Sequence, residues 1–178
     1  MWSPDRGGTS RRRFLTALAV PLAAGLSGCG FHPLYGETPS GEATLTELAQ
    51  VRVASIPDRP GQILRNGLVT ALDPQNLGLP KVYRLETTLT EIRSEAGVRE
   101  DETATRSTLN LTANFKLYRI SDGASLYGAS AIAIASYDIL DSGFATDVAL
   151  SDVRRRSLQQ LVQDIRRRLA GYFQTHEA

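Results

Sequence analysis

The sequence predicts an α+β fold: a two-layer sandwich with a four-stranded, mostly antiparallel sheet packed against two helices, in the order β-α-β-β-β-α. Three stretches between residues 83 and 137 alternate apolar and polar side chains, which is typical of strands with one buried face. Two further stretches, 60–72 and 150–173, repeat apolar residues every three or four positions, which is typical of helices that bury one side. One-sided sheets and one-sided helices are stable when they cover each other.

The first predicted strand lies within residues 48–56, where Val51 and Val53 flank Arg52. A Pro-rich and Gly-rich break at 57–61 ends the strand and starts a helix that Asp73-Pro74 stops. The apolar side of that helix contains Leu64, Gly67, Leu68, Ala71 and Leu72.

The next three predicted strands form an antiparallel series. The alternation that begins at Tyr83 gives the first, and a charged loop at 95–102 follows it. The second strand alternates from Leu109 to Leu117, and Ser121-Asp122-Gly123 is a tight-turn signal. The third strand spans 126–137, and its small residues are expected to let a helix approach the sheet closely.

After a loop at 138–144 the chain is predicted to be helical almost to its end. One apolar stripe contains Leu150, Leu158, Leu161, Val162, Ile165, Leu169, Tyr172 and Phe173. Arg154 lies on the same side as this stripe. One interpretation is that its stem covers the core while its charge reaches water; the other is that it faces an anionic ligand or a partner.

Residues 1–28 have the plan of a secretory signal peptide. Three arginines at 11–13 precede an apolar run from Phe14 to Leu26, and Ser27-Gly28 precede a cysteine. The apolar run is 13 residues long, whereas a membrane-spanning helix needs about 20. We therefore expect removal of 1–28, a tether at 29–47 because of its Pro and Gly content, and a single domain at 48–178.

Leu26-Ser27-Gly28-Cys29 resembles the lipobox of bacterial lipoproteins, in which the cysteine receives diacylglyceryl and N-acyl lipid. Cys29 would then be the first residue of the mature chain. Stable anchoring requires at least two acyl chains, and such a modification supplies them. Ser10 to Leu15 also resembles a twin-arginine export signal, but an ordinary basic leader for the general route explains the same residues.

Composition limits the functions that the mature domain could have. The full chain has 20 basic and 19 acidic residues among 178, and removal of the leader leaves 16 basic and 18 acidic residues. A slightly acidic domain lacks the positive field that nucleic-acid binding requires. Cys29 is the single cysteine of the sequence, so we expect no disulfide.

Few residues are available for catalysis or metal binding. The two histidines, His32 and His176, lie near the ends of the mature chain, and no metal-binding pair or phosphate loop occurs. The acids at 100–102 are most simply a solvated loop. We therefore predict a protein that is not an enzyme and that carries no metal and no cofactor apart from the lipid on Cys29.

The segment after Cys29 adds a family resemblance. A lipobox followed by Gly-Phe-His-Pro-Leu-Tyr-Gly at 30–36 is similar to the start of the LPS-assembly lipoprotein LptE family in its alphaproteobacterial form. The resemblance implies a two-layer α+β fold and a lipid anchor at the periplasmic face of the outer membrane. It also implies a role as a plug that assists assembly of the LptD β-barrel and delivery of lipopolysaccharide to the outer leaflet. Phe31, Leu34 and Tyr35 are then expected to dock on the domain, the lipid surface or a partner.

A plug that handles lipopolysaccharide needs polar faces for a wet lumen and arginines for phosphates. The polar strand positions suit such a lumen, and the candidate phosphate contacts are Arg93, Arg99, Arg106 and Arg154. Ordinary surface charge explains each arginine equally well. Two rival functions remain open: an accessory lipoprotein of another envelope lipid-transport complex, and a periplasmic enzyme with an unrecognised site.

Overall fold

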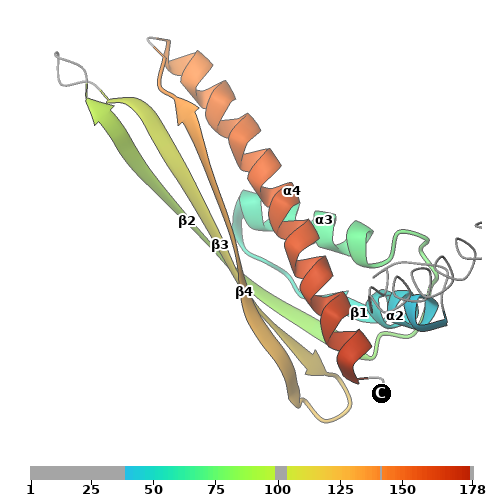
Figure 1. Cartoon of the computed structure of the whole chain (residues 1–178). Coiled ribbons are helices and arrows are strands. Elements are labelled where there is room, and N and C mark those ends of the chain that lie inside the picture. Colours follow the sequence, from blue (N-terminus) through green and yellow to red (C-terminus); the bar gives the residue numbers. More distant parts are fainter. Residues whose placement is uncertain (1–38, 99–103, 141, 177–178) are drawn as a thin grey trace, which may run out of the picture. The chain divides into compact units, whose positions relative to one another are not determined.

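The computed structural model describes residues 39–98, 104–140 and 142–176, all within one compact unit. In these ranges the chain forms three helices and four strands in the order α-β-α-β-β-β-α (Figure 1). The elements are α2 (Pro39–Ala49), β1 (Val51–Val53), α3 (Asp58–Leu72), β2 (Tyr83–Val98), β3 (Ala104–Arg119), β4 (Ser125–Asp138) and α4 (Gly143–His176).

The four strands form one open sheet in which spatial order follows chain order, β1-β2-β3-β4. β1 is parallel to β2, with Val51 opposite Tyr83. A parallel pair needs a crossover connection, which α3 provides. β3 is antiparallel to both β2 and β4. Leu85, Leu117 and Tyr127 lie side by side across these three strands. The predicted α+β sandwich with a mostly antiparallel sheet is confirmed.

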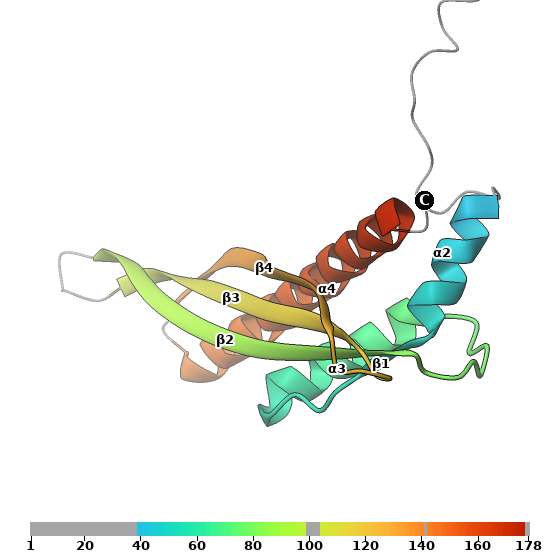
Figure 2. The ribbon, with the colours of Figure 1, turned by 90° about the horizontal axis from the view of Figure 1, so that it is seen from below.

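The helices cover one side of this sheet (Figure 2). α3 and α4 pack against each other, and α4 also contacts β3 and β4. We call this side of β2, β3 and β4 the covered face, and the opposite side the open face. Odd-numbered residues face the helices, so Leu109, Leu111, Ala113, Phe115 and Leu117 are all buried. Even-numbered residues between them are half-buried or exposed.

The core forms where these apolar rows meet. Leu64, Leu68 and Leu72 of α3 are buried against the sheet and α4. In α4 the predicted stripe is confirmed: its residues from Leu150 to Phe173 are buried, and Tyr172 is partly buried. Ala131 and Ala133 are fully buried on β4, and their small side chains allow the close approach of α4.

One predicted boundary is wrong. Residues 39–47, assigned above to a tether, belong to helix α2, which packs against α3 and α4. Gly41, Thr44 and Leu48 are buried at spacings of three and four residues, which is a short helical stripe. Pro39 is compatible with this helix because it stands at its first position, where no backbone donor is needed. The rest of the proposed tether, 29–38, lies outside the described residues.

The first strand is also shorter than predicted, because α2 takes up residues before it and β1 contains only Val51–Val53. Conversely, β2 and β3 extend the hairpin into the predicted loop, with Val98 opposite Ala104. None of the helices in the described ranges is both long enough and apolar enough to cross a membrane.

Candidate functional site

The predicted site residues fall into two groups. Cys29, Phe31, Leu34, Tyr35 and Arg99 lie outside the described residues. The structure places the remaining candidates, and they are Arg93 on β2, Arg106 on β3 and Arg154 on α4.

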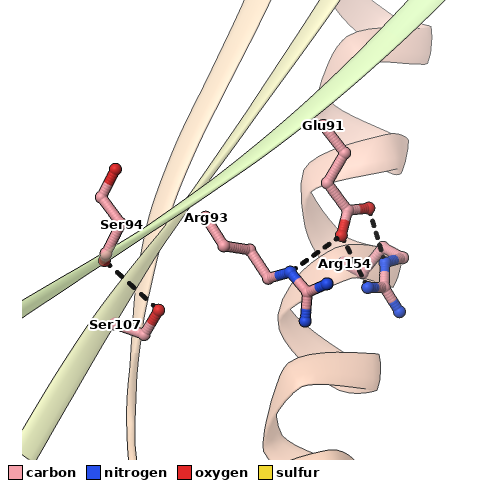
Figure 3. Close-up of polar contacts among 5 residues, drawn as sticks. All are labelled: Glu91, Arg93, Ser94, Ser107 and Arg154. Atoms are coloured by element: carbon pink, nitrogen blue, oxygen red, sulfur yellow. Dashed lines mark hydrogen bonds and ion pairs between the residues drawn. The ribbon is translucent and has the colours of Figure 1, made fainter. Parts of the chain in front are cut away.

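Arg154 is bound to the sheet by a two-pronged ion pair with Glu91 of β2 (Figure 3). Arg154 Nε donates to Glu91 Oε2 at 2.8 Å, and Nη2 donates to Oε1 at 2.7 Å. Both side chains are largely shielded, with 25% of Arg154 and 20% of Glu91 exposed. Such bidentate pairs are the strong members of their class, so this contact fixes α4 against β2.

This geometry differs from the interpretation in which Arg154 carries its charge into water. Its guanidinium instead spans from the helix to Glu91. The hydrogen bonds that Arg154 donates to Glu91 raise the pKa of Arg154 above its ordinary value, although partial burial opposes that rise. Arg154 is therefore a permanent cation whose hydrogen-bonding edge already has an acceptor.

Arg93 shares the same carboxylate. Its Nε lies 3.8 Å from Glu91 Oε1, and 57% of its side chain is exposed (Figure 3). Two guanidinium groups against one carboxylate leave a net charge of about +1 at this place, by simple counting of ionised groups. Arg93 is thus the more available cation of the pair for an anionic ligand.

The polar contacts beside this cluster are structural. Ser107 is 2% exposed, and its Oγ donates to the backbone oxygen of Ser94 at 3.3 Å (Figure 3). A buried hydroxyl needs such a partner. This bond joins β2 to β3 near the end of the hairpin and gives Ser107 no free donor for a ligand.

Arg106 lies on the other side of the sheet. It is an even-numbered residue of β3, on the open face, and its Nε lies 3.3 Å from Asp138 Oδ1 of β4. Both side chains are about two-thirds exposed, at 64% and 66%, and exposed pairs of this kind contribute little to stability. The structure therefore brings Arg93 and Arg154 together but separates Arg106 from them.

Sequence reasoning missed a set of exposed arginines along α4. Arg155 and Arg156 both pair with Asp152, at 3.1 Å and 3.0 Å. Further along the helix, Arg167 and Arg168 both pair with Asp164, at 3.2 Å and 3.0 Å. The signal is present in the sequence as an Asp followed by arginines three and four residues on, repeated after twelve residues. The outer side of α4 consequently carries more positive than negative charge.

A small polar pocket of about 270 Å³ has a lining that includes Glu47, Tyr83, Arg119, Tyr172 and His176. Burial first, then hydrogen bonding to Glu47, raises the pKa of Tyr83 to about 12. The His176 ring stacks on Tyr172 at 4.2 Å between centroids, and its Nδ1 lies 2.9 Å from the Tyr172 backbone oxygen.

No serine, threonine, cysteine or lysine lines this pocket. The hydroxyl groups on its lining are those of Tyr83 and Tyr172, so the lining does not supply the serine, threonine or cysteine nucleophile of a catalytic triad. In the described ranges, moreover, no three His, Cys, Asp or Glu side chains gather in a way that could hold a metal ion.

The fold and the charged cluster together define a class: a one-sided α+β sandwich with an ion-paired helix across its sheet and no assembled catalytic group among the described residues. The model of the family "LptE: Lipopolysaccharide-assembly" matches residues 48–169. The chain belongs to this family. Comparison with curated proteins gives no match.

Solved structures with the same fold include three bacterial lipoproteins. A candidate lipoprotein from Caulobacter crescentus CB15 is 21% identical, with a TM-score of 0.61, covering 74% of this chain and 96% of that one. A minor lipoprotein from Acinetobacter baumannii is 19% identical, with a TM-score of 0.55 and coverages of 69% and 92%. An uncharacterized lipoprotein B from Nitrosomonas europaea is 13% identical, with a TM-score of 0.53 and coverages of 68% and 82%. These likenesses support the fold.

Proposed function

We propose that this protein is an outer-membrane lipoprotein, anchored at the periplasmic face by acyl chains on Cys29, that plugs and assists assembly of an LptD-type β-barrel. In that position it takes part in delivering lipopolysaccharide to the outer leaflet. The observation that carries the proposal is the match to the lipopolysaccharide-assembly family over 48–169. The lipobox-like sequence before Cys29 supports the anchor.

The geometry is compatible with a binding role. A plug must keep its shape without help from the barrel, and here two helices and three long strands share one core. A plug in a wet lumen also needs polar surfaces. The open face supplies rows of hydroxyl and amide side chains, and α4 supplies exposed arginines.

The proposed phosphate contacts are Arg93, Arg99, Arg106 and Arg154. Of those that the structure describes, Arg93 and Arg106 have the exposed guanidinium groups, whereas Arg154 is held by Glu91. We therefore assign direct contact first to Arg93 and Arg106. Arg154 can bind a phosphate only if at least one of its hydrogen bonds to Glu91 breaks.

The decisive test of the function is depletion of the protein in its native host. We expect unassembled barrel and less lipopolysaccharide at the cell surface, measured by heat-modifiable electrophoresis of the barrel and by surface labelling. Mass spectrometry of the purified mature protein should find acyl chains on Cys29. Normal barrel assembly after depletion would contradict the function, and a bare Cys29 thiol would contradict the anchor.

The phosphate contacts have a separate test. Replacing Arg93, Arg99 and Arg106 together by glutamine should weaken binding to purified lipopolysaccharide by about tenfold, since charge-assisted hydrogen bonds contribute roughly 1.5–3 kcal/mol each and exposure reduces this. The matched control removes the same charge from α4 by replacing Arg155, Arg156 and Arg167. Equal losses in the two variants would show that net charge alone matters.

The rival classes give different outcomes. Co-purification with an inner-membrane ATPase complex in place of a β-barrel would favour an accessory subunit of another lipid-transport system. An enzyme would require activity that disappears in His176→Ala, because His176 is the single histidine of the described residues and lines the polar pocket. The pocket lining contains no serine, threonine or cysteine, so the geometry supports the binding role better.

A further inference from the structure

Three exposed isoleucines gather on the open face of the sheet. Ile92, Ile132 and Ile134 are 56%, 55% and 62% exposed. The strand register places them on two adjacent rows of the sheet. Ile92 of β2 and Ile134 of β4 lie on either side of Asn110 of β3, and Ile132 pairs with Thr112 on the next open-face row. No helix in the described ranges covers this side (Figure 2).

The isoleucines lie within a wider area that carries no charge. We call it the isoleucine patch and define it as the open-face positions of β2 from Thr88 to Ser94, of β3 from Thr108 to Asn114, and of β4 from Ser130 to Ser136. Its other members are serine, threonine and asparagine. Ser130 Oγ donates to Asn114 Oδ1 at 2.5 Å, and the hydroxyls of Thr108 and Ser136 lie 3.2 Å apart.

Charged residues occur only beyond the two ends of the patch on the described part of this face. One end has the Arg106 and Asp138 pair. The other has Arg84, which lies over the Tyr118 ring at 5.4 Å and pairs with Glu86 at 3.1 Å. The patch therefore complements a surface that is polar but uncharged. The outer side of α4, in contrast, carries exposed arginines and is positively charged.

A shallow groove of about 510 Å³ begins at one end of the isoleucine patch, where Asn114 and Ser130 line it. Beyond the patch its lining includes Gly128 and the charged side chains of Glu86 and Lys116. It is open because Gly128, opposite Lys116, has no side chain. Glycine weakens a strand interior and often marks close approach by another group. The open face thus offers apolar projections and, at one end of the patch, a hollow for a partner's side chain.

We propose that the isoleucine patch is the surface that docks against the inner wall of the β-barrel, a neutral, hydrogen-bonding, pleated surface. This inference rests on the proposed function and specifies which face meets the barrel. The hydroxyl and amide groups between the isoleucines need hydrogen-bond partners when they are buried. A protein wall supplies such partners, whereas lipid tails do not. Sheets also pack well on sheets, because their pleats and twists match.

The size of the patch argues against a second copy as the occupant. Six residues along a strand span about 20 Å, and three strands with their side chains about 15 Å. That area, on the order of 300 Å², is well below the ~800 Å² per partner of a stable interface. A barrel that surrounds the domain adds contacts elsewhere, which a dimer through this patch alone does not.

Photo-crosslinking in the native host tests the docking surface. A benzoylphenylalanine at Ile134 in the full lipidated chain should crosslink to the barrel several-fold more efficiently than one at Val69, an apolar residue of α3 that is 45% exposed. Equal yields from both positions, or a crosslink from Ile134 to a second copy or to lipid, would overturn the inference. Co-purification of the barrel with each variant shows that the complex itself is present.

A second variant separates docking from folding. Gly128→Val places a strand-favouring side chain in the groove, where an added Cβ meets Lys116 Cγ at an ordinary 3.5 Å. We expect an unchanged or higher melting temperature and about tenfold less co-purified barrel. Undiminished co-purification overturns the inference while leaving the proposed function intact. If the wild-type chain purifies without any barrel, both the inference and the proposed function are contradicted.

Discussion

The covered and open faces of the sheet are built from the same strands but follow different rules. On β3, the covered positions from Leu109 to Leu117 are at most 2% exposed, and each contacts the helices or the neighbouring strands. The open positions between them are half-buried or exposed and mostly polar. The covered face is explained by folding, since each of its apolar residues gains free energy by leaving water.

The same explanation fails for the three isoleucines of the open face. More than half of each side chain remains in water, so folding gains little from them. Contiguous exposed apolar groups usually mark a surface that meets something else. One sheet can therefore separate stability and binding onto opposite faces, and substitutions on each face test that separation.

The largest effect is expected on the covered face. Phe115→Ala removes a ring that is 2% exposed and that lies 6.1 Å from the Tyr127 ring. We expect a loss of about 3–5 kcal/mol in the free energy of unfolding, measured by urea denaturation. The adjacent open-face substitution Asn114→Ala is the control, and equal losses from the two would mean that the faces do not differ.

The next effect concerns the contact between β2 and α4. Glu91→Gln leaves the Arg154 guanidinium partly buried without a counter-charge, which should cost about 1.5–3 kcal/mol. The matched control is Asp138→Asn, which breaks the exposed pair with Arg106 and should cost no more than about 0.5 kcal/mol. Both values come from denaturant titration.

A double variant refines this result. Removing both charges, as Glu91→Leu with Arg154→Met, should recover most of the lost stability, because an uncompensated charge costs more than an absent pair. A double variant as unstable as Glu91→Gln would indicate that these residues act through packing and not through their charges.

A smaller effect is expected where α3 meets α4. A Cβ on Gly67 would lie 2.8 Å from Val162 Cγ2, so Gly67→Ala requires the Val162 side chain or one of the two helices to shift. Overpacking costs roughly 1–3 kcal/mol, and the better helix propensity of alanine returns about 1 kcal/mol, which leaves a net loss of about 1 kcal/mol. Val162→Ala in the same chain should relieve it, and strictly additive losses in the double-mutant cycle would contradict the clash.

The sequence contains most of the information for the covered face. Alternation from Leu109 to Leu117 and the stripe from Leu150 to Phe173 both predicted burial correctly. The hydrophobic effect is non-directional, so an apolar position can be recognised as buried before the partner that covers it is known. Helix α2 was missed because Pro39 and Gly41 suggest a loop, and only packing against α3 and α4 makes so short a helix stable.

The candidate site was harder to predict because it depends on register. Arg93 and Arg106 flank the same hairpin in sequence. Successive side chains of a strand point to opposite faces, and the pairing of β2 with β3 places these two arginines on opposite faces of the sheet. The inward orientation of Glu91 could have been predicted, since Glu91 continues the alternation in which Leu85 and Leu89 face inward. A buried charge requires a partner. The sequence does not show that this partner is Arg154, because the pairing depends on how α4 crosses the sheet.

The smallest effect on stability is expected from the residue with the largest proposed effect on binding. Ile134→Asn replaces a side chain that is 62% exposed, so the free energy of unfolding should change by no more than about 0.5 kcal/mol. The same variant should lower co-purification of the barrel, because asparagine retains polarity but removes the apolar projection. Ile134→Val, which keeps most of that projection, should bind almost normally. If Ile134→Asn instead unfolds the chain by several kcal/mol, the isoleucine belongs to the folding core and the two faces are not separated as described.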